Sequence, residues 1–195
     1  DLHVIEIDVL SDAQVSAGVA EAERINGGPV DVLVNNAGVV MGGPVEVQDM
    51  AATQLQFDTN VFGYHRLARA VLPGMRRRQS GLIVNVSSQQ GRVIMPGGAL
   101  YAATKFAVEA FAEQLAYELV PNGIDVVIIQ PGGYPTEVGQ NRAKYTQALA
   151  DRIEPEHAEG YPEMVERMKA MRTARNGPVP PGMPDPIDVP NTIAA

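Results

Sequence analysis

The stretch that decides the fold class is Leu-Ile-Val-Asn-Val-Ser-Ser at residues 82–88. Its first five residues have the length and composition of a buried strand, and two serines follow where that strand would end. Similar apolar runs occupy residues 3–7, 31–34 and 124–129. Strands buried on both faces are typical of parallel sheets covered by crossover helices.

Helical segments separate these strands. We expect a first helix that is capped by Ser11 or Asp12 and ends near residues 26–28. A second helix should cover about 49–78 and be divided near Thr59 and Asn60, and a third should cover 99–119. This alternation predicts an α/β protein with a doubly wound, Rossmann-like parallel sheet and right-handed crossovers.

The pattern changes towards the carboxyl end. Residues 136–175 are polar and helical, and we interpret them as a lid over a substrate site. Residues 177–190 contain six prolines, which predicts an extended connection, because proline cannot continue a helix or a central strand. A proline-rich ligand for a partner domain is the alternative. Residues 187–195 resemble the entry to another helix, and we assign residues 1–195 to one domain.

Composition excludes several classes of protein. The formal charge of −8, from 15 basic and 23 acidic residues, argues against nucleic-acid binding. The absence of cysteine excludes disulfides, thiolate metal sites and a cysteine nucleophile, and is consistent with a cytoplasmic protein. No apolar run approaches the roughly 20 residues that cross a bilayer. His3, His65 and His157 lack the spacing of metal ligands, so we expect no metal.

Tyr101 and Lys105 provide the strongest local signal for chemistry. Positions four apart share a helix face, so the phenol and the ammonium should project into the same space. A nearby cation lowers the pKa of a phenol from about 10 towards neutrality. Ser88, at the carboxyl end of the third strand, could hold a carbonyl oxygen while Tyr101 protonates it. Each of these features alone is equally typical of an ordinary surface pair or a turn.

Three further patterns lie at strand ends and in a helix. Asn36, Ala37 and Gly38 follow a buried strand and suit a turn that another group can approach closely. Asn60 is a polar residue whose amide can bind backbone and interrupt its helix. Residues 131–136, Pro-Gly-Gly-Tyr-Pro-Thr, form a constrained loop after the fourth strand.

Together these motifs resemble the single-domain branch of the short-chain dehydrogenases/reductases. The Asn-Asn-Ala-Gly turn, the helical asparagine, the strand ending in Ser-Ser, Tyr-x-x-x-Lys and Pro-Gly-x-x-x-Thr occur in the family's order and spacing. The resemblance covers nearly the whole chain and weakens after Thr136. It implies an NAD(P)-dependent oxidoreductase that interconverts an alcohol and a carbonyl.

The resemblance also implies residue roles. Tyr101 is the general acid/base, Lys105 lowers its pKa and binds the nicotinamide ribose, Ser88 polarises the substrate, and Asn60 holds a water that links Lys105 to solvent. The implied cofactor contacts, besides those of Tyr101 and Lys105, are Asp8, Val9, Asn36, Ala37, Gly38, Pro131, Gly132, Tyr134 and Thr136.

Two parts of the family pattern have no counterpart in the sequence. No Gly-x-x-x-Gly-x-Gly turn is present to bind the pyrophosphate, so we expect the first β-α-β segment, and the last strand, to lie outside this chain. The segment that distinguishes NAD from NADP is among them, and the choice between the two stays open.

Other functions are less consistent with the motifs. A non-catalytic relative that only binds cofactor would not need the four-residue set, and sugar-nucleotide epimerases or dehydratases carry a larger carboxyl-terminal domain. Neither serine lies in a Gly-x-Ser-x-Gly elbow of a hydrolase. The substrate is expected to be a small, fairly apolar alcohol or carbonyl surrounded by Val39, Val40, Met41, Val93, Met95 and Tyr134. The resemblance implies a homodimer or homotetramer formed through the helices at 50–78 and 99–119.

Overall fold

The computed structural model describes residues 2–171 and 184–194, and in them a parallel sheet forms the centre of the molecule. Its strands are β1 (Val32–Asn35), β2 (Gly81–Val86) and β3 (Ile124–Ile129), hydrogen-bonded in the order β1-β2-β3. Asn35 pairs with Asn85, and Val86 with Ile129, so the strands end at one edge. The predicted Rossmann-like α/β fold with a parallel sheet is confirmed.

The helices before and between the strands also follow the prediction. They are α1 (Asp12–Asn26), α2 (Met50–Phe57), α3 (Gly63–Arg78) and α4 (Ala99–Leu119), with a π-helical turn, η1 (Asp58–Phe62), between α2 and α3. The short 3₁₀ turns η2 (Gln89–Gly91) and η3 (Val120–Asn122) flank α4. Ser11 caps α1 by accepting the Gln14 amide at 3.3 Å, and Gly27 ends it with φ 70°, a conformation that glycine adopts without strain.

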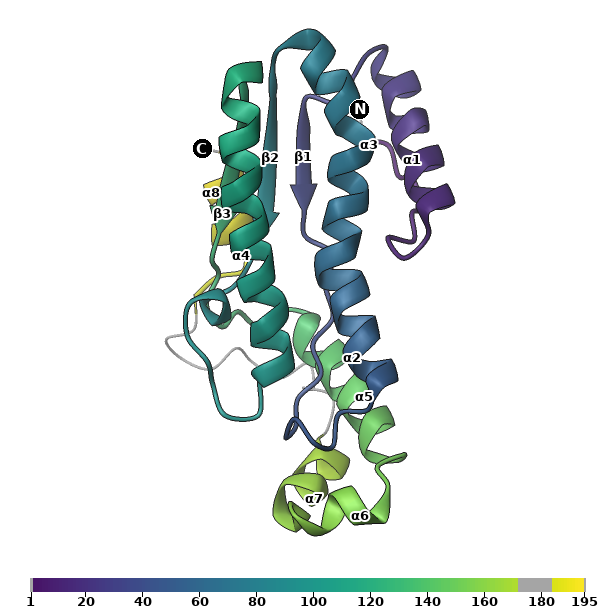
Figure 1. Cartoon of the computed structure of the whole chain (residues 1–195), viewed down its shortest axis with the longest axis vertical. Coiled ribbons are helices and arrows are strands. Elements are labelled where there is room, and N and C mark those ends of the chain that lie inside the picture. Colours follow the sequence, from purple (N-terminus) through teal and green to yellow (C-terminus); the bar gives the residue numbers. More distant parts are fainter. Residues whose placement is uncertain (1, 172–183, 195) are drawn as a thin grey trace.

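The main core lies between the sheet and the helices α3 and α4, which cover one of its faces (Figure 1). α1 packs along α3 on the far side from α4. The buried side chains that join these elements are Val19, Ala68, Val71, Met75, Ile83, Leu115, Leu119 and Ile124. This packing fixes α4 against β2 and β3, and therefore fixes where its first turns lie relative to the strand ends.

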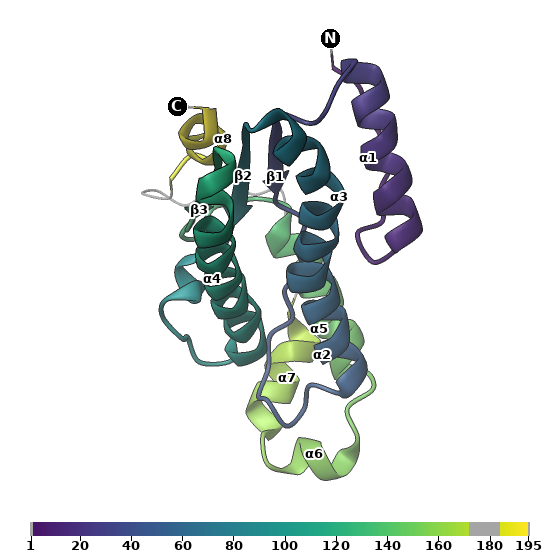
Figure 2. The ribbon, with the colours of Figure 1, turned by 45° about the horizontal axis from the view of Figure 1, so that its top comes forward.

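A second core joins the segment after β1 to the helices beyond the carboxyl ends of the strands, α5 (Val138–Ala150), α6 (Pro155–Glu159) and α7 (Pro162–Ala170) (Figure 2). Its buried members are Met41, Val47, Ala52, Leu149, Ala150, Val165 and Met168. Polar contacts add to it: Thr146 Oγ1 accepts the Gly42 amide at 3.1 Å, and Arg152 pairs with Asp49. The predicted lid is thus packed against the body of the protein over its described residues, 136–171, whereas residues 172–175 lie outside the description; its role over a substrate stays a prediction.

Residues 3–7 do not form the predicted strand. Ile5 and Ile7 face α1, where the Ile7 side chain covers Gly18, while Val4 is 91% exposed. Exposed and half-buried side chains alternate along this segment, but no strand of the described residues lies beside it. A strand is defined by its interstrand hydrogen bonds, so alternation without a neighbour is not sufficient.

The second face of the sheet is less covered than the first. Val32, Val34 and Val127 are 49%, 40% and 40% exposed. β1 is an edge of the described sheet.

The carboxyl-terminal helix α8 (Asp188–Ala194) confirms the helix expected over 187–195. It begins inside the predicted proline-rich connection, because Pro190 lies in its first turn, where a missing N–H costs nothing. Residues 177–183 of that connection lie outside the described residues. The assignment of one domain stays a prediction.

In the described parts of the chain, no helix is both long and apolar enough to cross a bilayer. Across the same residues, no three histidine, aspartate or glutamate side chains come together as metal ligands would.

Candidate active site

A cavity of about 470 Å³ opens at the carboxyl ends of the strands. Three of the four predicted catalytic residues line it, Ser88, Tyr101 and Lys105. Most of the predicted cofactor contacts line it as well: Asn36, Gly38, Pro131, Gly132, Tyr134 and Thr136. Segments as far apart in the sequence as Asn36 and Pro190 therefore meet around one space, and its volume lies within the usual range for a small-molecule site.

Tyr101 lies in the first turn of α4, and Ser88 lies just beyond β2. Ser88 caps η2 by accepting the Gln90 amide at 3.1 Å, which fixes its side chain. Burial raises the pKa of the Tyr101 phenol above its usual value, and a hydrogen bond with the Ser88 side chain acts against this rise. Ser88 and Tyr101 therefore lie near each other on the wall of the same cavity.

Lys105 lies one turn further along α4 and is only 4% exposed. Its ammonium donates to the Val86 carbonyl at 2.9 Å, and the buried Tyr64 hydroxyl donates to the same oxygen at 3.1 Å. The ammonium lies 5.8 Å from the centre of the Tyr101 ring and 5.6 Å from that of Tyr64. Burial lowers the pKa of Lys105 to about 8, and the Glu109 charge acts against this fall.

The expected lowering of the Tyr101 pKa by Lys105 is not what this geometry produces. The ammonium lies over the ring and bonds to Val86, whereas the phenol pKa is raised by burial. Desolvation of the phenolate is therefore the larger effect. The low pKa of the ammonium has the same cause, since burial disfavours both charged forms.

Asn60 lies in η1 and is fully buried. Its side-chain oxygen accepts the Val39 amide at 2.8 Å, and its nitrogen donates to the Val39 carbonyl at 2.9 Å and to Thr104 Oγ1 at 3.1 Å. The Thr104 hydroxyl in turn donates to the Tyr101 carbonyl at 2.7 Å. The prediction that this asparagine binds backbone and interrupts its helix is confirmed, and the amide connects the strip after β1 to α4 behind the cavity.

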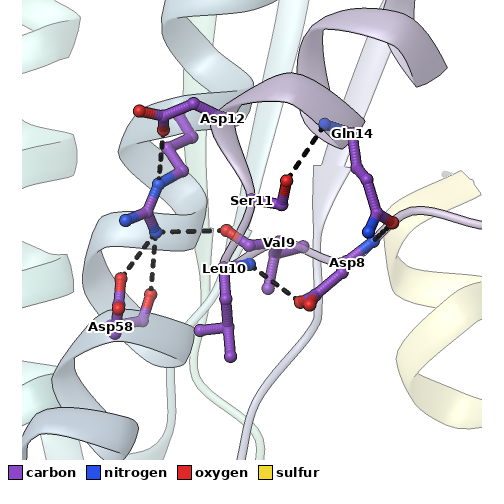
Figure 3. Close-up of polar contacts among 8 residues, drawn as sticks. Asp8, Val9, Leu10, Ser11, Asp12, Gln14 and Asp58 are labelled. Atoms are coloured by element: carbon purple, nitrogen blue, oxygen red, sulfur yellow. Dashed lines mark hydrogen bonds and ion pairs between the residues drawn. The ribbon is translucent and has the colours of Figure 1, made fainter.

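Asp8 and Val9 do not line the cavity. Figure 3 shows them in the turn before α1, where Asp8 accepts the Leu10 amide at 2.9 Å. Arg66 of α3 holds this turn by donating to the Val9 carbonyl at 3.1 Å and pairing with Asp12 and Asp58 at 2.7 and 2.6 Å. The turn is thus fixed to the start of α3 and does not form part of the cavity wall.

The apolar surroundings differ from the expected set. Val40 and Tyr134 line the cavity, but Met41 is buried under α5, and Val93 and Met95 are half exposed. Sequence reasoning missed other lining residues: Gln89, Gln90, Val138, Arg142 and Val189. Gln89 and Gln90 directly follow Ser88, which would have indicated them. Val138, Arg142 and Val189 come from α5 and α8, whose positions no local pattern predicts.

Comparison with known proteins identifies relatives over most of the chain. A family model described as short chain dehydrogenase matches residues 1–147. Retinol dehydrogenase 8 from Bos taurus is 48% identical over 136 residues, which make up 70% of this chain and 43% of that protein. The Homo sapiens protein of the same name is 43% identical over 156 residues, or 80% of this chain and 49% of the relative. A 3-ketodihydrosphingosine reductase from Bacteroides thetaiotaomicron is 38% identical over 141 residues, or 72% of this chain and 52% of the relative.

Solved structures resemble the fold as well. A short chain dehydrogenase/reductase from Burkholderia phymatum in complex with NAD superposes with a TM-score of 0.72 at 27% identity, covering 89% of this chain and 61% of that one. A gluconate 5-dehydrogenase from Burkholderia cenocepacia, solved with NADP and tartrate, gives 0.65 at 32% identity, covering 75% and 58%. The chain spans about half the length of the curated relatives that it matches.

Proposed function

The chain belongs to the short-chain dehydrogenase family, and on that premise we propose that its protein interconverts an alcohol and a carbonyl by hydride transfer with NAD or NADP, with Tyr101 as the general acid/base. The observation that supports this most is that Ser88, Tyr101 and Lys105 line the same cavity as the turn at Asn36 and the loop at Pro131. An ordinary surface pair at Tyr101 and Lys105 would not need this enclosure.

The cavity fits the nicotinamide end of such a cofactor. Relatives of this fold have been solved with NAD and with NADP. In this chain the Lys105 ammonium can donate to ribose hydroxyls, and Pro131, Gly132, Tyr134 and Thr136 form a wall that can meet the carboxamide. Asn36, Ala37 and Gly38 would lie along the adenosine side, with Asp8 and Val9 near the adenine. The cofactor, when bound, supplies or accepts the hydride.

The protein's own residues manage the proton and the substrate oxygen. In reduction, the Tyr101 phenol gives its proton to the carbonyl oxygen as the carbon receives the hydride; in oxidation, its phenolate takes the proton from the alcohol. The Ser88 hydroxyl donates a hydrogen bond to the same oxygen and stabilises the charge that develops there. Burial keeps Tyr101 protonated near neutral pH, which suits its role as the acid.

Asn60 supports the site through its position. Its side chain is already occupied by Val39 and Thr104, so a water linking Lys105 to solvent would be held by the main-chain carbonyl of Asn60. Asn60 lies in a π-helical turn, which alters the backbone hydrogen-bond ladder locally and is frequent at functional sites.

We propose a fairly apolar alcohol or carbonyl as the substrate. Val40, Val138 and Val189 provide apolar walls, while Arg142 adds one cation at the cavity edge. Two relatives are named for retinol and 3-ketodihydrosphingosine, an alcohol and a ketone on long hydrocarbon frames. These names support the class of substrate and no particular molecule.

The alternative is a relative that binds cofactor without turnover. Titration of the protein with NADH and NADPH, followed by nicotinamide fluorescence, tests binding and the choice of cofactor. Turnover of a panel of apolar alcohols and ketones then tests catalysis. Tyr101→Phe should abolish turnover and leave the fold unchanged; an active Phe variant would refute the proposed role of Tyr101.

We further propose that two copies pair through α3 and α4. A groove of about 380 Å³ lies between the outer faces of these helices, where the rings of His65 and Phe111 meet edge to face at 5.1 Å. Arg69 on α3 and Glu118 on α4 line it with opposite charges, which a two-fold axis can bring together. Light scattering of Arg69→Glu tests this, because the charge reversal should yield monomers.

A further inference from the structure

Glu109 is a buried carboxylate that the proposed reaction does not use. It lies on α4, one turn beyond Lys105, and is 3% exposed. Buried carboxylates occur almost only where they are paired. Gln130 donates its side-chain amide to both carboxylate oxygens at 2.9 Å, and Arg92 pairs with one of them at 3.0 Å.

The partners of Glu109 belong to the two loops that form the cavity wall. Arg92 follows η2, the turn that Ser88 caps. Gln130 follows β3 and directly precedes Pro131. A single carboxylate therefore connects the helix of Tyr101 and Lys105 to the loop of Ser88 and to the loop of Pro131.

The backbone of the Ser88 loop lies directly against this carboxylate. A Cβ atom at Gly91 would stand 2.8 Å from Glu109 Oε1 and 2.7 Å from Ser87 Oγ, closer than such atoms approach in proteins. Only glycine fits here without displacing one of these groups. The distance from the carboxylate to the Ser88 loop is thus fixed by contact on one side and by the Arg92 ion pair on the other.

Glu109 also lies one helical turn from Lys105 on α4, close enough for its charge to act on the ammonium. The groups around the ammonium are the phenols of Tyr64 on α3 and Tyr101 on α4, the Val86 carbonyl on β2 and Glu109. Burial favours the neutral amine, and the Glu109 charge opposes it. Arg92 partly neutralises Glu109, and its other partner, Glu113, is exposed.

From this geometry we propose that Glu109 is a positioning residue for the site: it fixes both wall loops to α4 and keeps Lys105 in its charged form. This inference rests on the proposed function for its importance to turnover. Its electrostatic part concerns Lys105 alone and can be measured without any reaction.

The test is an NMR titration of Lys105. The chain has three lysines, Lys105, Lys144 and Lys169, so ¹³Cε labelling of lysine gives few signals, and the one absent from Lys105→Met is assigned. In the wild type this signal should titrate near pH 8. Glu109→Gln should move its midpoint to lower pH, whereas Glu109→Asp, which keeps the charge, should move it less. Glu118→Gln, at an exposed position near the far end of the same helix, is the matched control and should leave it unchanged.

Arg92→Gln provides a second variant at a half-exposed side chain, in case Glu109→Gln does not fold. Removing this cation leaves the Glu109 charge less neutralised, so the Lys105 midpoint should rise, opposite to the effect of Glu109→Gln. An unchanged midpoint in Glu109→Gln overturns the inference, and so does an unchanged midpoint in Arg92→Gln where only that variant folds. An equal shift in Glu118→Gln overturns it as well. Absence of turnover in the wild type would contradict the proposed function and leave this titration as the measure of Glu109.

Discussion

Replacing Lys105 by methionine should make the protein more stable at neutral pH, although it removes a residue that the proposed reaction needs. Lys105 is 4% exposed, and its pKa is lowered from 10.5 to about 8. This difference of about 2.5 pH units corresponds to about 3 kcal/mol of unfavourable free energy for the charged form in the folded state at pH 7. Methionine has a similar length and no charge, so it removes this cost.

The change also removes one hydrogen bond. The bond from Lys105 to the Val86 carbonyl contributes about 1 kcal/mol, and that oxygen keeps the bond from Tyr64. The expected net gain is therefore about 2 kcal/mol, or about 4–8 °C in Tm for a chain of this size. Urea denaturation at pH 7, monitored by circular dichroism, measures it, and an unchanged m-value would show that both states keep their compactness.

The pH dependence identifies the cause. Between about pH 8 and 10.5 the unfolded chain still holds the Lys105 proton and the folded protein does not, so the wild type should gain stability as pH rises through this window, by up to about 1.4 kcal/mol per unit. Lys105→Met lacks this term, and its advantage should vanish towards pH 10.5. The exposed Lys144→Met is the control and should show neither effect. A Lys105→Met variant that is less stable at pH 7, or whose advantage does not change with pH, would refute the reasoning.

Three further predictions concern Tyr101, Asn60 and the lid. Burial raises the pKa of Tyr101, so alcohol oxidation, which needs the phenolate, should increase towards alkaline pH, whereas carbonyl reduction should stay level near neutrality. Ser88→Ala removes the hydrogen bond that lowers this pKa and should move the pH profile of oxidation to higher pH. Initial rates in both directions measure these profiles. Asn60→Ala leaves the Val39 amide and carbonyl without their partner and should lower the free energy of unfolding, measured by urea denaturation, by about 1–3 kcal/mol. Asn191→Ala on α8 is the matched control and should change this free energy little. Leu149→Ala empties a fully buried position of α5 and should cost about 2–5 kcal/mol, with faster hydrogen exchange in α5 and α7 than in α4. Equal exchange in all three helices would show that the lid is not a separate packing unit.

The helices and strands whose boundaries and apolar pattern are marked along the chain itself were predictable from the sequence. The helix at 99–119 and the strand at 124–129 match the structure to the residue, because Gly98 precedes the helix, the turn Pro121-Asn122-Gly123 separates the two elements, and the strand is a nearly continuous apolar run that stops before Pro131. Asn60 was also readable, since a polar amide inside a helix needs a nearby backbone partner, here Val39. The prediction of a strand at 3–7 was wrong, because alternating apolar residues form a strand only beside a second strand, and none of the described strands pairs with this segment.

The sequence by itself determined the order of strands and helices, the parallel sheet and the residue types at each strand end, because these follow from hydrophobic periodicity and turn chemistry along the chain. Only the tertiary structure decided which side chains share the cavity: it brings Val138, Arg142 and Val189 to Tyr101 and leaves Asp8 and Val9 outside. It also decided the protonation behaviour of the site. The spacing of Tyr101 and Lys105 suggests that the ammonium lowers the phenol pKa. In the structure, burial raises the pKa of the Tyr101 phenol and lowers the pKa of the Lys105 ammonium, because desolvation depends on the packing of β2, α3 and α4 around both groups.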